Sequence, residues 1–226
     1  MKKIQMVDLQ SQYYKIKNEV DNAVSNVMDS AAFINGPEVK SFQNELESYL
    51  DVKHVIPCAN GTDALQIALM ALDLKEGDEI ITADFTFAAT VEVIHLLKLK
   101  SVLVDVDYDT FTISTEAIKK AITPKTKAII PVHLFGQCAN MEEILKIAEQ
   151  HNLYVIEDNA QAIGAEFTFS DGTVKKAGTM STVGTTSFFP SKNLGCYGDG
   201  GAIFTNNDEL AHRLRGIVNH GMYERY

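Results

Sequence analysis

A lysine in the last fifth of the sequence stands between an apolar segment and a loop that contains glycine. Lys192 follows Ser187-Phe188-Phe189-Pro190-Ser191 and precedes Asn193-Leu194-Gly195. A lysine in this setting is expected to be partly desolvated, which favours the neutral amine, a nucleophile and a former of Schiff bases. The residue types alone leave open the alternative of a solvated lysine on a surface loop.

A carboxylate ends an apolar run in the middle of the chain. Asp158 closes the segment Leu153-Tyr154-Val155-Ile156-Glu157. A carboxylate at the end of a buried strand is costly unless it is paired or hydrogen-bonded. Asp158 could therefore provide a counter-charge for a cationic ligand atom, or it could only cap the segment that follows.

The run Asn60-Gly61-Thr62 falls between a predicted strand and a predicted helix. Gly61 would let the backbone approach a ligand closely, and the start of a helix presents free N–H groups and the positive end of its dipole. These features indicate a phosphate site. Asn and Thr are also good N-cap residues, so an ordinary helix cap is the alternative.

The segments that carry these residues alternate between strand and helix patterns. The short, β-branched, apolar strands are typical of a parallel sheet buried on both faces, and the last two are joined by a Gly-rich loop without a helix. We predict an α/β fold with a mostly parallel, mixed sheet flanked by helices, preceded by a helical segment over about residues 1–50. The predicted strands are 54–58, 79–82, 101–106, 128–132, 153–158, 181–189 and 201–205; the predicted helices are 16–28, 38–49, 62–72, 86–97, 115–122, 141–151 and 208–216.

Composition and charge exclude several classes of function. The 226 residues are 46% hydrophobic, and the net charge of −10 without a basic cluster argues against a nucleic-acid partner. No apolar run is long enough for a membrane span, and the start of the sequence turns polar too soon for a signal peptide, so we expect a cytoplasmic protein. The three cysteines are expected to be buried free thiols, and the six histidines show no metal-ligand spacing.

Nucleotide-binding fingerprints are missing as well. Cys196-Tyr197-Gly198-Asp199-Gly200-Gly201 is rich in glycine but lacks the strand and helix context of a dinucleotide fingerprint, and no GxxxxGK[ST] run occurs. A nicotinamide-dependent sugar enzyme would need such a fingerprint.

Several motifs, spread over essentially the whole chain, occur together in one protein family. The most specific are Ile156-Glu157-Asp158-Asn159-Ala160-Gln161, Ser187 to Gly195 and Gly198-Asp199-Gly200-Gly201, with further matches at 33–39, 60–65, 77–81 and 122–133. In these motifs the chain resembles the pyridoxal-phosphate (PLP) dependent nucleotide-sugar aminotransferases of the DegT/DnrJ type. The resemblance implies the large domain of the aspartate-aminotransferase fold over residues 1–226.

The resemblance also implies roles for single residues. Lys192 would hold PLP as a Schiff base and move a proton between substrate and cofactor, and Asp158 would pair with the protonated ring nitrogen. Phe87 would stack on the ring, and Gln161 would lie near the ring hydroxyl. The phosphate would be held by Gly61, Thr62 and Ser187. No metal is implied.

Substrate and assembly follow from the same resemblance. The amino donor would be glutamate, and the acceptor a keto-sugar linked to UDP or dTDP, used for cell-surface polysaccharide, lipopolysaccharide or amino-sugar biosynthesis. The sequence around Lys192 is similar to members that aminate carbon 3. The family's small C-terminal domain is expected to be absent, since the sequence ends soon after His220-Gly221, and the full-length protein is expected to be a homodimer. A non-catalytic PLP- or sugar-binding regulator on the same fold is the alternative.

Overall fold

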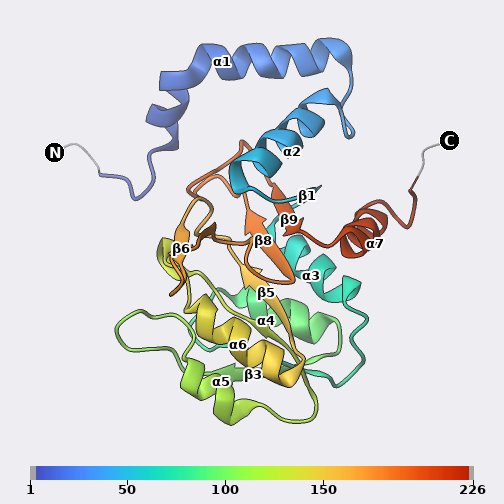
Figure 1. Cartoon of the computed structure of the whole chain (residues 1–226). Helices are drawn as coiled ribbons and strands as arrows, with labels where there is room; N and C mark the ends of the chain where they lie inside the picture. Colours follow the sequence, from blue (N-terminus) through green and yellow to red (C-terminus); the bar gives the residue numbers. More distant parts are fainter. Residues whose placement is uncertain (1–3, 224–226) are drawn as a thin grey trace.

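A computed structural model describes residues 4–223 of the chain. Its centre is a seven-stranded sheet in which only β9 is antiparallel to its neighbours, so the predicted mixed, mostly parallel sheet is confirmed (Figure 1). In spatial order the strands are β1 (His54–Cys58), β9 (Gly201–Thr205), β8 (Val183–Ser187), β5 (Tyr154–Asp158), β4 (Thr126–Ile130), β2 (Glu79–Ala83) and β3 (Lys100–Val104).

Helices cover both faces of the sheet because alternate strand residues point to opposite sides. Ile80 and Ile156 pack on one face, while their neighbours Ile81 and Val155 pack on the other. The first face is covered by α3 (Gly61–Ala71), α4 (Ala88–Leu96) and α7 (Asp208–Val218), and the second by α5 (Thr115–Ala121) and α6 (Met141–His151).

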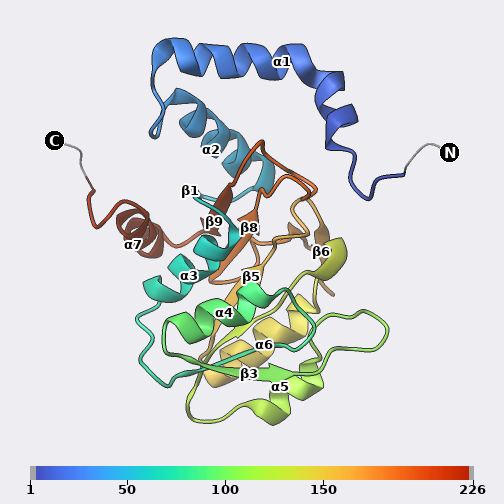
Figure 2. The ribbon, with the colours of Figure 1, turned by 180° about the vertical axis from the view of Figure 1, so that it is seen from behind.

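Two helices precede the sheet. α2 (Pro37–Leu50) packs Leu46 and Leu50 against the β1 and β9 end of the sheet. α1 (Leu9–Ser30) buries no residue and lies outside the sheet and its covering helices, beyond α2 in both views, where Tyr13 packs edge-on against Tyr197 (Figures 1 and 2). Among the described helices, none combines the length and the apolar character that a bilayer crossing requires.

Three elements of only three residues each are absent from the sequence prediction. The hairpin of β6 (Glu166–Thr168) and β7 (Val174–Lys176) and the short 3-10 helix η1 (Leu134–Gly136) were not predicted. The Asp171-Gly172 pair between β6 and β7 is a hairpin signal, but three-residue strands are too short to show an alternating pattern. The predicted strand 181–189 is shortened to β8, and the predicted helix 86–97 begins later, at Ala88.

The strand directions decide where polar residues meet. β1, β2, β3, β4, β5 and β8 all run the same way, so their carboxyl ends lie along one edge, where β9 begins. Ligands of open α/β sheets bind outside this edge.

Candidate active site

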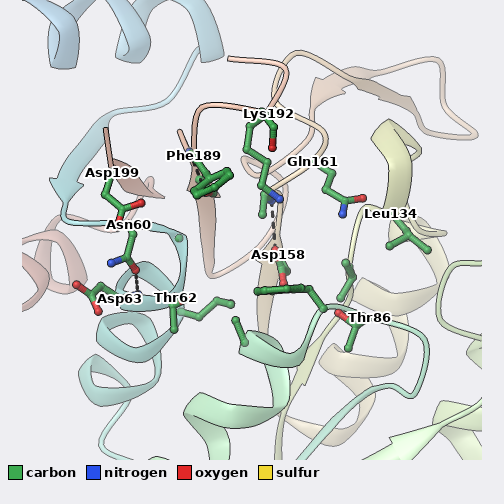
Figure 3. A pocket seen from close by; sticks show the side chains of 18 residues that line it. Asn60, Thr62, Asp63, Thr86, Leu134, Asp158, Gln161, Phe189, Lys192 and Asp199 are labelled. Carbon is green, nitrogen blue, oxygen red and sulfur yellow. Dashed lines mark hydrogen bonds between the residues drawn. The ribbon is translucent and has the colours of Figure 1, made fainter. Parts of the chain in front are cut away.

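A cavity of about 640 Å³ opens at the carboxyl edge of the sheet (Figure 3). Its walls come from the segments that follow β1, β2, β4, β5 and β8, which lie far apart in the sequence. The structure brings all seven predicted site residues to this cavity: Gly61, Thr62, Phe87, Asp158, Gln161, Ser187 and Lys192.

The start of α3 forms one wall. The Asn60 side chain caps the helix by accepting a hydrogen bond from Asp63 N (2.8 Å). The N–H groups of Gly61 and Thr62 belong to the first helical turn, where intrahelical acceptors are missing. The cap and the phosphate site are therefore compatible, because the cap uses the N–H group of Asp63 and leaves those of Gly61 and Thr62, two residues that line the cavity, available to a ligand.

Gly61 is required by a close approach of two segments. A Cβ atom at Gly61 would lie 2.6 Å from Cβ of Ser187 and 3.2 Å from its Oγ, so the helix start and the end of β8 touch only because the side chain is absent. This contact brings the Ser187 hydroxyl beside the helix N-terminus, as a cradle for an anion requires.

Gly61→Ala is expected to lower the free energy of unfolding by about 1–3 kcal/mol, because the added methyl group must push α3 away from β8. Urea denaturation would measure the change. The double variant Gly61→Ala/Ser187→Gly removes the clashing Cβ and should recover part of the loss. An unfolding free energy equal to that of the wild type in the single variant would contradict the contact.

Asp158 ends β5 with its carboxylate facing the cavity (Figure 3). The residue is 5% exposed, and its oxygens accept hydrogen bonds from Thr90 Oγ1 (2.8 Å) and Ala160 N (3.2 Å). Burial raises the pKa of Asp158, while these hydrogen bonds and the charge of Lys192 act against the rise. None of the salt bridges within residues 4–223 involves Asp158. A cationic ligand atom would give this buried carboxylate its missing partner.

Lys192 lies in a turn beyond β8, where its backbone N–H donates to Phe189 O (2.8 Å). Its side chain is half-buried and extends toward Asp158 across the cavity (Figure 3). The lysine is therefore partly desolvated, as predicted, and its amine faces the carboxylate.

Phe87 and Gln161 complete the predicted set. Phe87 is the N-cap residue of α4 and 71% exposed, so one face of its ring is open to a ligand. The Gln161 side-chain oxygen accepts a hydrogen bond from Phe135 N (2.7 Å), which leaves its NH₂ group to donate elsewhere.

Sequence reasoning assigned no role to two threonines, of which Thr86 lines the cavity and Thr90 is buried behind its wall. Thr90 donates to Asp158, and Thr86 Oγ1 lies 2.9 Å from Thr90 Oγ1. Thr86 directly precedes the N-cap residue of α4, and Thr90 lies in the first turn of that helix. Nothing in this local sequence shows that the two hydroxyls meet each other or that Thr90 meets Asp158.

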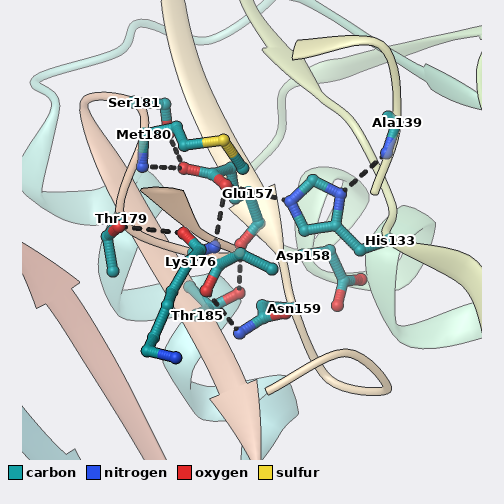
Figure 4. A network of polar contacts seen from close by, with 12 residues as sticks. His133, Ala139, Glu157, Asp158, Asn159, Lys176, Thr179, Met180, Ser181 and Thr185 are labelled. Atoms are coloured by element: carbon teal, nitrogen blue, oxygen red, sulfur yellow. Dashed lines mark hydrogen bonds and ion pairs between the residues drawn. The ribbon is translucent and has the colours of Figure 1, made fainter. Parts of the chain in front are cut away.

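A second network lies on the other side of β5 (Figure 4). The fully buried Glu157 carboxylate accepts four hydrogen bonds, of 2.8 to 2.9 Å, from Gly178 N, Met180 N, Ser181 Oγ and His133 Nε2. Ala139 N donates to His133 Nδ1 (3.1 Å), so the histidine proton resides on Nε2. The backbone of His133 also donates to Asp158 O (3.0 Å), which ties this network to the position of Asp158.

The cysteines differ from the expectation in burial. All three are free, but each is only partly buried. Burial raises the pKa of Cys58 to about 12 and of Cys138 to about 11, so both are protonated at neutral pH. Residues 4–223 contain no group of three acidic, His or Cys side chains that could hold a metal ion.

The fold and the cavity define an α/β domain whose sheet edge brings together a helix N-terminus, a buried carboxylate, an amine and an exposed aromatic ring. A family model for the DegT/DnrJ/EryC1/StrS aminotransferase family matches residues 14–226. The chain belongs to this family.

Two curated relatives show how much of a member the chain spans. It is 48% identical over 223 residues to a UDP-2-acetamido-2-deoxy-3-oxo-D-glucuronate aminotransferase of Pseudomonas aeruginosa, covering 99% of the chain and 61% of the relative. It is 49% identical to a pleiotropic regulatory protein of Geobacillus stearothermophilus, covering 99% of the chain and 59% of the relative. The chain thus spans about three fifths of the length of these relatives.

Solved structures agree with the fold. DesV of S. venezuelae superimposes with a TM-score of 0.95 at 38% identity, covering 100% of this chain and 60% of that one. NtdA of Bacillus subtilis, solved with the bound cofactor PMP, superimposes with a TM-score of 0.87 at 34% identity, covering 96% of this chain and 48% of that one.

Proposed function

We propose that the protein is a PLP-dependent aminotransferase that transfers an amino group from glutamate to carbon 3 of a nucleotide-linked keto-sugar. The observation that carries this proposal is the buried Asp158 carboxylate, which faces both the cavity and Lys192 without an ion-pair partner among the described residues. A protonated pyridine nitrogen beside Asp158 and an aldehyde beside Lys192 would satisfy both groups.

The other residues of the cavity fit the same cofactor. The first turn of α3 and the Ser187 hydroxyl would hold the phosphate together, since the missing Cβ of Gly61 lets Ser187 lie beside the helix N-terminus. The exposed face of Phe87 would stack on the ring, and the Gln161 NH₂ group would donate to the ring hydroxyl. When bound, the protonated cofactor ring supplies an electron sink for carbanion chemistry.

The chain's own groups would then perform the proton work. Asp158 would keep the ring nitrogen protonated, because a buried carboxylate attracts a cation more strongly in a low dielectric than in water. Lys192 Nζ would bind the cofactor covalently at rest and, once displaced by a substrate amine, take the proton from the substrate carbon.

The substrate class draws on the relatives. The Pseudomonas aeruginosa relative is named for a UDP-linked 3-oxo sugar, which supports a 3-keto nucleotide sugar as acceptor. Polysaccharide biosynthesis in the cytoplasm and a homodimeric assembly complete the proposal. The regulatory name of the Geobacillus relative favours the alternative of a non-catalytic regulator. The presence of both Lys192 and Asp158 in one cavity supports the enzyme.

Purified protein with added PLP is expected to be yellow, and glutamate should shift its visible absorbance within a single turnover. A panel of 3-keto and 4-keto nucleotide sugars should then yield an amino-sugar only from the 3-keto compounds, as measured by product mass. Cofactor binding without a half-reaction toward any donor or acceptor would favour the regulator. Product from 4-keto sugars alone would overturn the choice of carbon.

A further inference from the structure

Behind the cavity wall, the Asp158 carboxylate is held from two sides by neutral donors. Ala160 N donates to Oδ1, and Thr90 Oγ1 donates to Oδ2 over the shorter distance of 2.8 Å. Thr90 is 0% exposed and lies in the first turn of α4, so its hydroxyl cannot exchange this bond for water.

The direction of the next hydrogen bond follows from the first. A threonine hydroxyl has one hydrogen, and that of Thr90 points to Asp158. The 2.9 Å contact between Thr86 Oγ1 and Thr90 Oγ1 must therefore be donated by Thr86, a residue that lines the cavity. The three groups form a chain in which each hydrogen bond polarises the next, and such chains are stronger than isolated bonds.

The start of α4 fixes the position of two groups in the proposed cofactor site. Phe87 is the N-cap residue of α4, and Thr90 lies in its first turn, three residues later. The same rigid turn thus sets the ring face of Phe87 and one oxygen of Asp158. Because Asp158 lies on β5, any shift of α4 against the sheet would change both contacts together.

We propose that Thr90 is a positioning residue that orients the Asp158 carboxylate toward the cofactor ring through its hydroxyl hydrogen bond. This inference rests on the proposed function, because it assigns to Asp158 the role of partner for a ring nitrogen. The hydrogen bond favours the ionised carboxylate, and so it opposes the rise in the pKa of Asp158 that burial causes.

The variants Thr90→Val and Thr90→Ser separate the hydroxyl from the shape of the side chain. Thr90→Val keeps the volume and removes the donor, and we expect it to weaken PLP binding by roughly ten-fold to a hundred-fold, the usual effect of losing a hydrogen bond to a charged group. Thr90→Ser keeps the donor and should bind PLP within about three-fold of the wild type. The full chain is titrated with PLP by fluorescence, and the visible absorption spectrum of the bound cofactor is recorded.

A matched control separates orientation from stability. Thr82 is also 0% exposed and donates a 2.9 Å hydrogen bond, but to the backbone oxygen of Ile130. Thr82→Val should destabilise the fold by a similar amount and leave the PLP affinity and spectrum unchanged. Equal PLP affinities and spectra for Thr90→Val and the wild type would overturn the inference alone, as would equal losses in Thr90→Val and Thr82→Val. A wild-type protein that binds no PLP would overturn the proposed function and the inference together.

Discussion

Lys192→Ala is expected to abolish covalent attachment of PLP. It should also lower any transaminase activity by roughly 10²- to 10⁴-fold, which is the usual contribution of a positioned acid–base group. Among the residues that line the cavity, Lys192 is the only one with a side-chain amine, and this amine faces Asp158. Borohydride reduction of the PLP-treated wild type, followed by peptide mapping, should place the label on the peptide that contains Lys192.

The control for this experiment is an exposed lysine elsewhere. Lys175 lies in the exposed hairpin strand β7, away from the residues that line the cavity. Lys175→Ala should keep the full label on Lys192. A label on any other lysine in the wild type, or one that persists in Lys192→Ala, would refute the assignment of the cofactor-binding amine and with it the proposed mechanism.

Glu157→Ala is expected to reduce the free energy of unfolding by about 3–5 kcal/mol, the usual cost of breaking a buried charged network by removing one partner. The substitution removes the acceptor of four donors at once, and three of these, Gly178 N, Met180 N and His133 Nε2, are buried. It also loosens the segment that fixes the backbone of Asp158, so we expect weaker cofactor binding as a secondary effect. Urea denaturation measures the first effect, and PLP titration the second.

The matched control is an exposed glutamate in an ion pair. Glu166 pairs with Lys176 at 3.2 Å with its side chain 57% exposed, and such surface pairs contribute at most about 1 kcal/mol. Glu166→Ala should therefore change the unfolding free energy by less than that amount. If Glu157→Ala costs no more than Glu166→Ala, the network of Figure 4 does not stabilise the sheet edge as inferred.

Several candidate site residues were predictable because each lies at or shortly after the end of an apolar strand in the sequence. Asp158 and Asn60-Gly61-Thr62 directly follow apolar strands, and Lys192 follows the apolar run that contains β8. Since carboxyl ends of parallel strands share an edge, a polar residue at such an end is placed near the others by the fold class alone. The family motifs made the cofactor assignment specific.

The partners of those residues depended on which strands are neighbours. Thr90 reaches Asp158 because α4 packs over the centre of the sheet, and Glu157 reaches His133 because β4 lies beside β5. Gly61 touches Ser187 although β9 lies between β1 and β8. Hydrophobic periodicity reports which face of an element is buried, not which element covers it.

The sequence by itself therefore determined the α/β fold, the family and the predicted residues that line the cavity, because local patterns and motifs encode them. Only the tertiary structure decided the Thr86–Thr90–Asp158 chain and the four-donor site around Glu157. These contacts join segments remote in the sequence, and their formation depends on strand order and helix packing, which arise from the balance of the whole core.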